Sequence, residues 1–235
     1  MQRLRQYLGF SLFLFGTLPT HAQTGGYTFK KEDPNGIGKW YMGREIAHVM
    51  GVAGMYWLER PERELEERAS LLFENMNIQP EDKIADIGAG SGYHVFRMAE
   101  QAKAGMIYAI DIQDEMLAVL EQKKNVGNHR NVSVIKGSIK NTNLPKNIFD
   151  KVLIVDVYHE MSYPIEVMQT VFQAMKPNGK LYLIEYRGED PKVPIKRLHK
   201  MTEAQAVKEM KSMGFQLEEN IGNLPWQHCM VFVNH

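Results

Sequence analysis

The strongest constraint on the fold is a regular alternation of short apolar segments with longer amphipathic ones from residue 83 onward. Runs of the kind that forms buried strands occupy residues 83–87, 106–110, 132–136, 149–155 and 180–185. Segments with helical spacing of apolar residues lie between them, at residues 93–101, 114–124 and 163–175. Such alternation predicts a parallel sheet with helices on both faces.

The end of the chain departs from this pattern. A helix predicted at residues 202–213 is followed by two short strands, at residues 215–219 and 229–233, with no helix between them. Strands joined without a crossover helix pair antiparallel, because a parallel pair needs a long connection. We therefore predict an α/β fold with a doubly wound, Rossmann-like sheet that is mostly parallel, ends in an antiparallel C-terminal strand pair, and carries helices on both faces.

The first 22 residues differ from the rest in composition. A basic start without acidic residues precedes an apolar stretch at residues 8–18, which is too short to span a bilayer. With the small residue Ala22 after it, this pattern is typical of a secretory signal cleaved before Gln23; a buried N-terminal helix is the alternative. We expect an exported protein, periplasmic or secreted, with no stable membrane insertion after cleavage.

A segment of intermediate character precedes the alternating core. Residues 23–39 are rich in glycine, lysine and polar residues and are expected to be a flexible leader, residues 40–55 to be partly helical, and residues 59–77 to form one helix. The stretch at residues 41–57 is unusually apolar, so it either covers a substrate as a lid or packs across the sheet. The expected organisation is a signal peptide (1–22), a flexible leader with a helical lid (23–79) and a core domain (80–235).

A glycine-rich turn carries the strongest sign of function. The sequence Asp86-Ile87-Gly88-Ala89-Gly90-Ser91-Gly92-Tyr93 leaves the first core strand and opens a helix. Glycines in such a turn let the backbone bend sharply and let a ligand touch the main chain. The spacing is G-x-G-x-G, whereas a dinucleotide site prefers G-x-G-x-x-G to seat a pyrophosphate at the helix N-terminus. An acid before the loop, Asp86, suits a ligand that carries an amine and repels a phosphate.

Two further turns lie at the ends of neighbouring strands. Asp111 ends the second core strand, about 20 residues after the glycines, which is the position of a ribose-binding carboxylate. The turn Gly137-Ser138-Ile139 follows the third strand and is placed to put Ser138 beside an adenine edge. Ligands of open α/β sheets lie beyond the carboxyl ends of the strands, so both turns are expected to face the ligand.

Asp86 with Gly88, Gly90 and Gly92, then Asp111, the Gly137-Ser138 turn, and Asp156 after the fourth strand resemble class I S-adenosylmethionine-dependent methyltransferases. The resemblance runs from about residue 80 to the C-terminus and includes the closing antiparallel strand pair. It implies S-adenosyl-L-methionine as the cofactor, with the glycine loop around its methionine part and Asp111 on its ribose. Many family members have an aspartate at the position of Ser138, so the serine is a departure. The predicted cofactor-binding residues are Asp86, Gly88, Gly90, Gly92, Tyr93, Asp111, Ile112, Gly137, Ser138, Ile139 and Asp156.

The turn after the fourth strand also carries the candidates for catalysis. In this family the position often lines the transferring methyl group, and His159 or Glu160 can take a proton from an acceptor hydroxyl or amine. Their alternative role is that of loop residues that cap the next helix or face solvent. A base is not required, because holding nucleophile, methyl carbon and sulfur in line supplies much of the acceleration. A basic loop at residues 187–201 either contacts an acidic substrate or is solvated surface.

Charge, cysteine and histidine content bear on which partners, disulfides and metal sites the chain can have. The 28 basic and 28 acidic residues balance, so the composition gives no reason to expect a nucleic-acid partner. The single cysteine, Cys229, cannot form an intrachain disulfide or a cysteine-based zinc site. The eight histidines show no paired spacing with cysteines or acids, so no metal site is expected. The oligomeric state is left open.

The expected function is transfer of a methyl group to a small-molecule or lipid-like acceptor by in-line displacement. The alternative is an exported, non-catalytic protein that keeps the fold and binds an adenosyl ligand, because the cofactor is made in the cytosol. A nicotinamide-dependent reductase is disfavoured by the G-x-G-x-G spacing and by the antiparallel strand pair.

Overall fold

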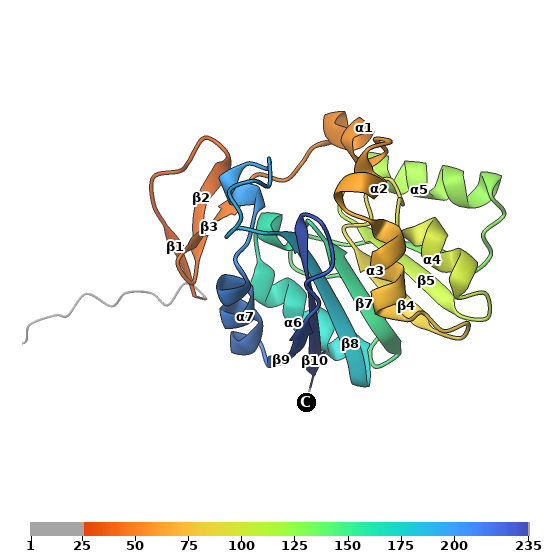
Figure 1. Ribbon diagram of the computed structural model, residues 1–235. Helices are drawn as coiled ribbons and strands as arrows, with labels where there is room; N and C mark the ends of the chain where they lie inside the picture. The colour runs from red at the N-terminus through yellow and green to blue at the C-terminus, as the bar shows by residue number, and fades with distance from the viewer. Residues whose placement is uncertain (1–25, 235) are drawn as a thin grey trace, which may run out of the picture.

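The computed structural model describes residues 26–234, which form a seven-stranded sheet flanked by helices and a separate three-stranded sheet (Figure 1). The large sheet has the order β6-β5-β4-β7-β8-β10-β9. Its strands are β4 (Lys83–Ile87), β5 (Met106–Asp111), β6 (Val132–Lys136), β7 (Phe149–Val155), β8 (Met175–Tyr186), β9 (Phe215–Asn220) and β10 (Gln227–Asn234). Strands β4 to β8 pair in parallel, whereas β10 pairs antiparallel with both β8 and β9. The predicted doubly wound sheet with its antiparallel C-terminal pair is confirmed.

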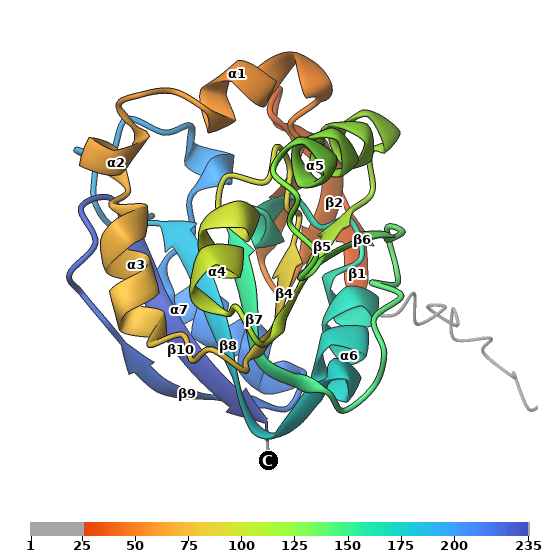
Figure 2. The same cartoon turned by 90° about the vertical axis from the view of Figure 1, so that its right-hand side faces the viewer.

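Helices cover both faces of this sheet (Figure 2). The apolar cluster on one face joins the strands to α3 (Ala69–Met76), α4 (Val95–Gln101) and α5 (Asp114–Val126). The cluster on the other face joins them to α6 (Pro164–Ala174) and α7 (Glu203–Ser212). Because β4 and β7 are buried between the two layers, their residues are apolar on both faces, as in Ile84, Ala85, Val152 and Leu153, all fully buried.

The switch in strand order sets the position of the site. Strands β4 and β7 are neighbours in the sheet, but the chain runs from the carboxyl end of β4 to β5 on one side and from that of β7 to β8 on the other. A crevice forms at such a point in an open α/β sheet, and ligands bind there.

The structure differs from the sequence prediction in the N-terminal region. Instead of a flexible leader, three antiparallel strands form here: β1 (Tyr27–Phe29), β2 (Gly36–Tyr41) and β3 (Arg44–Ala47). Of residues 40–55, expected to be partly helical, only 52–55 are helical. The turn between β2 and β3 places Met42 and Gly43 at positive φ, of 47° and 106°.

Contacts with the core explain why this small sheet is ordered. Arg44 of β3 forms an ion pair of 2.7 Å with Glu209 of α7, and Tyr41 bonds to Ser212 of the same helix at 2.8 Å. Tyr27 of β1 donates to Glu166 of α6 at 2.6 Å. These partners lie more than a hundred residues away in sequence, so no local pattern could have shown them.

The helix predicted over residues 59–77 is also divided. Residues 59–77 contain two separate helices, α2 (Arg63–Glu66) and α3, and η1 (Val52–Gly54) and α1 (Met55–Leu58) precede them. Arg68 takes a left-handed φ of 52° between α2 and α3 and so changes the direction of the chain. The predicted signal peptide at residues 1–22 lies outside the described residues. Within residues 26–234, we find no helix with the length and apolar character that crossing a membrane requires.

Candidate functional site

A cavity of about 560 Å³ opens at the carboxyl ends of β4, β5 and β7. Its floor is formed by the turns that follow these strands, and η1 and α1 contribute to its wall. In both views α1 lies over the sheet at this end of the molecule (Figures 1 and 2). The cavity therefore lies where the strand order predicts a ligand.

The glycine loop forms one side of the cavity. Gly88 and Gly90 have φ of 74° and 54°, in the left-handed region that favours glycine. A Cβ atom on Gly88 would lie 2.6 Å from the Val157 side chain, and one on Gly90 would lie 2.8 Å from Leu58. Gly92 does not line the cavity; a Cβ there would meet Phe96 and Leu120, so this glycine allows helix packing.

Asp86 at the end of β4 is a buried carboxylate beside this loop. Its side chain lies in the cavity wall, and its Oδ2 atom has no hydrogen-bond partner within residues 26–234. Burial raises the pKa of Asp86 to about 7, and the Asp111 carboxylate adds to this effect while Arg63 opposes it. A carboxylate in this state fits a cationic ligand group, which would supply both a hydrogen bond and a compensating charge.

Asp111 ends β5 and is hydrogen-bonded to the glycine loop. One oxygen accepts from the Gly90 N–H at 2.9 Å and the other from the Gln113 N–H at 2.9 Å. The carboxylate is thereby fixed, with lone pairs left for the hydroxyls of a ribose. Next to it, Ile112 is 39% exposed, and Ile139 of the following turn is 51% exposed. Both apolar side chains line the cavity, and such surfaces suit the two faces of an adenine ring.

Ser138 lies in the cavity wall, but its hydroxyl is used within its own turn. The Oγ atom accepts from the Asn141 N–H at 3.1 Å and donates to the Asn141 carbonyl at 3.3 Å. Gly137, on the same turn, also lines the cavity. The contact of Ser138 with adenine stays a prediction. To make it, the hydroxyl would have to share or give up these local hydrogen bonds.

Asp156 follows β7 with φ of 52°, unusual for a non-glycine residue. Its N–H donates to the Ile184 carbonyl at 2.9 Å, and its Oδ2 accepts from Gln227 at 2.6 Å, so the strained conformation is held from two sides. The Oδ1 atom is buried and has no partner in the described part of the chain. Burial, with the nearby charges of Glu67 and Glu185, raises the pKa of Asp156 well above its usual value.

A cluster of polar side chains at the cavity was not predicted from the sequence, and part of it comes from the N-terminal helices. Arg63 pairs with Glu67 at 2.6 Å, and Tyr186 at the end of β8 donates to Glu67 at 2.7 Å. The Arg63 guanidinium also lies 4.2 Å from the centre of the Tyr93 ring, which is a predicted site residue. All four residues line the cavity, and Arg63 and Glu67 come from α2 and the turn that follows it.

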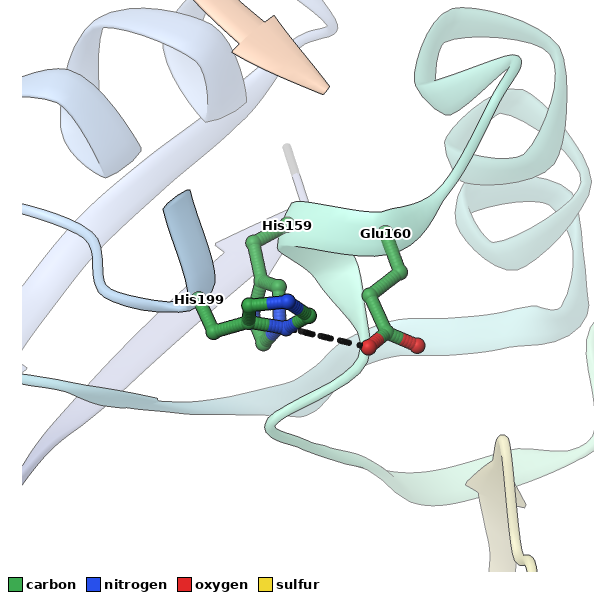
Figure 3. Close-up of side chains that lie close together, drawn as sticks. All are labelled: His159, Glu160 and His199. Carbon is green, nitrogen blue, oxygen red and sulfur yellow. Dashed lines mark hydrogen bonds and ion pairs between the residues drawn. The ribbon is translucent and has the colours of Figure 1, made fainter. Parts of the chain in front are cut away.

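His159 and Glu160 lie in the short 3-10 helix η2 (Tyr158–Glu160), and both line the cavity. The fold adds His199, which comes from η3 (Arg197–His199) in the basic loop (Figure 3). The Nε2 atom of His159 lies 3.1 Å from Nδ1 of His199, and the latter lies 3.2 Å from Oε1 of Glu160. On its other side, Nδ1 of His159 lies 2.6 Å from the fully buried Glu185. No metal site was expected, because these histidines are 40 positions apart in sequence.

The electrostatics of this cluster favour one positive charge between its carboxylates. Burial alone would lower the pKa of His159, but the charges of Glu185 and Glu160 outweigh it and raise the pKa to about 10. Burial would raise the pKa of Glu160, but hydrogen bonds with His159 and His199 lower it to about 2. Without another cation, the raised pKa of His159 favours its protonated form at neutral pH.

The segments predicted to contact a substrate are only partly at the cavity. From residues 41–57, Met50, Tyr56 and Trp57 line it, whereas Tyr41 is buried in the small sheet. From the basic loop, residues 194–196 and His199 line it. The ammonium group of Lys200 instead donates to backbone carbonyls within the loop, at 3.1 and 3.3 Å.

Comparison with known proteins agrees with this geometry. Residues 78–230 match the family model described as a methyltransferase domain. The ubiquinone/menaquinone biosynthesis C-methyltransferase UbiE of Wigglesworthia glossinidia brevipalpis is 30% identical over 109 residues, which are 46% of this chain and 44% of that protein. The demethylmenaquinone methyltransferase of Geobacillus sp. is 31% identical over 111 residues, 47% of each chain. The chain thus spans about half the length of the curated relatives it matches.

Solved structures support the fold. A SAM-dependent methyltransferase from Aquifex aeolicus superimposes with a TM-score of 0.72 at 20% identity and covers 79% of this chain and all of its own. The methyltransferase CalH in complex with SAH gives a TM-score of 0.57 at 18% identity, covering 72% of this chain and 56% of its own. The family match covers well over half of the chain, from a few residues before β4 to the middle of β10. The chain therefore belongs to the methyltransferase-domain family, and its domain is of the type that uses S-adenosylmethionine.

Proposed function

We propose that the protein transfers the methyl group of S-adenosylmethionine to a small-molecule or lipid-like acceptor that enters the same cavity. The observation that carries this proposal is the continuity of the cavity, which extends from the glycine loop past Asp156 to His159 and Glu160. A cofactor and a second molecule can then lie end to end in one continuous cavity.

The cofactor supplies an electrophilic methyl group on sulfur, and the residues of the chain bind and orient it. Gly88 and Gly90 present main chain to the cavity, Asp86 offers an unpaired carboxylate oxygen to the ammonium group of the cofactor, and Asp111 offers acceptors to its ribose. These contacts fix the sulfonium relative to the acceptor, which is the main requirement of in-line transfer.

The acceptor half of the cavity combines apolar walls with one polar cluster. Met50, Tyr56 and Trp57 form the apolar wall, with Tyr56 79% exposed and Trp57 38% exposed. Exposed aromatic side chains beside a cavity favour a ring or an acyl chain over a charged acceptor. We propose that His159 and Glu160 contact the polar atom that is methylated or that directs methylation. The relatives named for quinone biosynthesis support an aromatic acceptor of this class.

A transfer assay with a labelled methyl group tests the proposal. The protein is incubated with methyl-tritiated S-adenosylmethionine and a panel of hydroxylated aromatic compounds, quinols among them, and both S-adenosylhomocysteine and label in the organic extract are measured. We expect equal amounts of the two products for at least one acceptor, and loss of both in an Asp111→Ala variant. Binding of S-adenosylhomocysteine without turnover for any acceptor would favour the non-catalytic alternative.

We also propose that the protein is exported. The basic start, apolar stretch and small residue at residues 1–22 support a cleavable signal peptide. Expression of the full chain in a bacterium, with fractionation and N-terminal sequencing of the product, tests it. We expect a periplasmic protein that begins at Gln23, and a cytosolic protein that retains residues 1–22 would refute the signal.

A further inference from the structure

The cluster at the acceptor end of the cavity has the composition of a metal site. Two histidines and one glutamate offer His159 Nε2, His199 Nδ1 and Glu160 Oε1, which all lie within 4.8 Å of one another. Two imidazoles with one carboxylate are a common donor set of zinc enzymes and of non-haem iron enzymes. We propose that His159, Glu160 and His199 bind one divalent transition-metal ion, with zinc as the first candidate.

The distances between the three atoms agree with a single ion. They are 3.1 Å between the two imidazole nitrogens, 3.2 Å between His199 and Glu160, and 3.7 Å between His159 and Glu160. Ligands on one face of a tetrahedron are separated by about 1.6 times the bond length, which is about 3.4 Å for bonds of about 2.1 Å. An ion slightly out of the plane of the three atoms would therefore lie at bonding distance from all of them, with little movement of the protein.

The residues around the cluster fix two of these ligands in the required orientation. Glu185, which is fully buried, lies 2.6 Å from Nδ1 of His159 and accepts from the His159 N–H at 3.2 Å. With an ion bound in place of the second ring proton, the proton on Nδ1 would point to Glu185 and the lone pair of Nε2 would point into the cluster. A carboxylate behind a histidine ligand is the usual arrangement in metal sites, because it sets the tautomer and raises the basicity of the imidazole. The Met50 N–H donates to the second oxygen of Glu160 at 3.1 Å, which leaves Oε1 for the ion.

Access to the cluster comes from the cavity. All three residues line it, and their side chains are 2%, 11% and 22% exposed for His159, Glu160 and His199. Three protein ligands leave at least one coordination position for a small molecule, as catalytic rather than structural zinc sites do. If the proposed function holds, that position would receive a hydroxyl or carbonyl oxygen of the acceptor, which the ion would polarise. This role rests on the proposed function, whereas metal binding itself does not.

Metal binding is measured without reference to activity. The purified protein is freed of metal with a chelator and titrated with Zn²⁺ by calorimetry, and with Co²⁺ while its visible absorption is recorded. The test variants are His199→Ala, which removes the most exposed ligand, and Glu185→Gln, which keeps the shape behind His159 but removes the charge. The control is His48→Ala, a histidine that is exposed and outside the cavity. Circular dichroism and thermal unfolding check that each variant is folded.

We expect one equivalent of Zn²⁺ per chain and a Co²⁺ spectrum typical of nitrogen and oxygen ligands, both unchanged in His48→Ala. His199→Ala should weaken Zn²⁺ binding by about 100-fold or more, and Glu185→Gln by about 10- to 100-fold. Less than a tenth of an equivalent in the wild type, or an unchanged affinity in folded His199→Ala, would overturn the inference and show a hydrogen-bonded cluster only. Metal binding without methyl transfer would leave the site intact and refute the proposed function, while transfer unaffected by metal removal would refute the role of the ion in the reaction.

Discussion

Replacement of Asp86 by asparagine tests the electrostatics of the cofactor site in the free protein. Burial raises the pKa of Asp86 from 3.8 to about 7, so above pH 7 the folded protein must hold an ionised carboxylate that the unfolded chain holds at less cost. The difference of about 3 pKa units corresponds to about 4 kcal/mol of folding free energy. Asp86→Asn has nearly the same shape and no charge, so it removes this cost.

The sign of the effect depends on pH. A carboxyl group whose pKa is raised by folding costs nothing below pH 3.8, where both states are protonated, and costs the full amount above pH 7. We therefore expect Asp86→Asn to lie within about 1 kcal/mol of the wild type at pH 4 and to be more stable at pH 8 by up to about 4 kcal/mol. For a chain of this size that corresponds to roughly 10 °C in melting temperature.

Urea unfolding of ligand-free protein at both pH values measures the difference, and a second series with saturating S-adenosylhomocysteine completes the test. With the ligand, whose ammonium group compensates the charge of Asp86, the order should reverse at pH 8 in favour of the wild type. A variant that is less stable at pH 8 without ligand, or a difference that does not change with pH, would refute the reasoning.

Three further predictions concern the loop, the ribose site and the small sheet. Asp111→Ala should weaken S-adenosylhomocysteine binding at least tenfold in calorimetry, because the ribose loses a buried acceptor, and an unchanged Kd would show that the ribose lies elsewhere. Gly88→Ala should lower both stability in urea and ligand binding, because the residue has a φ of 74° and its Cβ would lie 2.6 Å from a neighbouring side chain. The control Gly222→Ala, at a position with open space around it, should unfold like the wild type. Arg44→Met leaves the buried Glu209 charge without its ion-pair partner and should lower the free energy of unfolding by about 3–5 kcal/mol in denaturant. The double variant with Glu209→Gln should recover part of that loss, and additive losses would contradict the pairing.

The sequence predicted the core of the fold because the core is built from local patterns. Strand and helix alternate with clear periodicity from residue 83, and the closing strands are joined by a loop, so parallel and antiparallel pairing both followed from connection length. Asp86, Asp111 and Asp156 could be placed at one edge of the sheet, since each ends a strand of the same direction.

The N-terminal sheet and much of the site depend on contacts that are distant in sequence. Residues 27–47 form strands because they pair with one another and bond to α6 and α7, where a composition rich in glycine and lysine suggested a leader. The meeting of His199 with His159 depends on how the loop after β8 folds back over the cavity. The spacing of residues along the chain does not show that these two histidines lie side by side.

The most direct test of the account is calorimetric titration of the folded protein with S-adenosylmethionine and S-adenosylhomocysteine. One site that binds both ligands competitively, weakened at least tenfold by Asp111→Ala, is the predicted result. Folded protein that binds neither ligand would contradict the assignment of the cavity as a cofactor site, and with it the proposed methyl transfer.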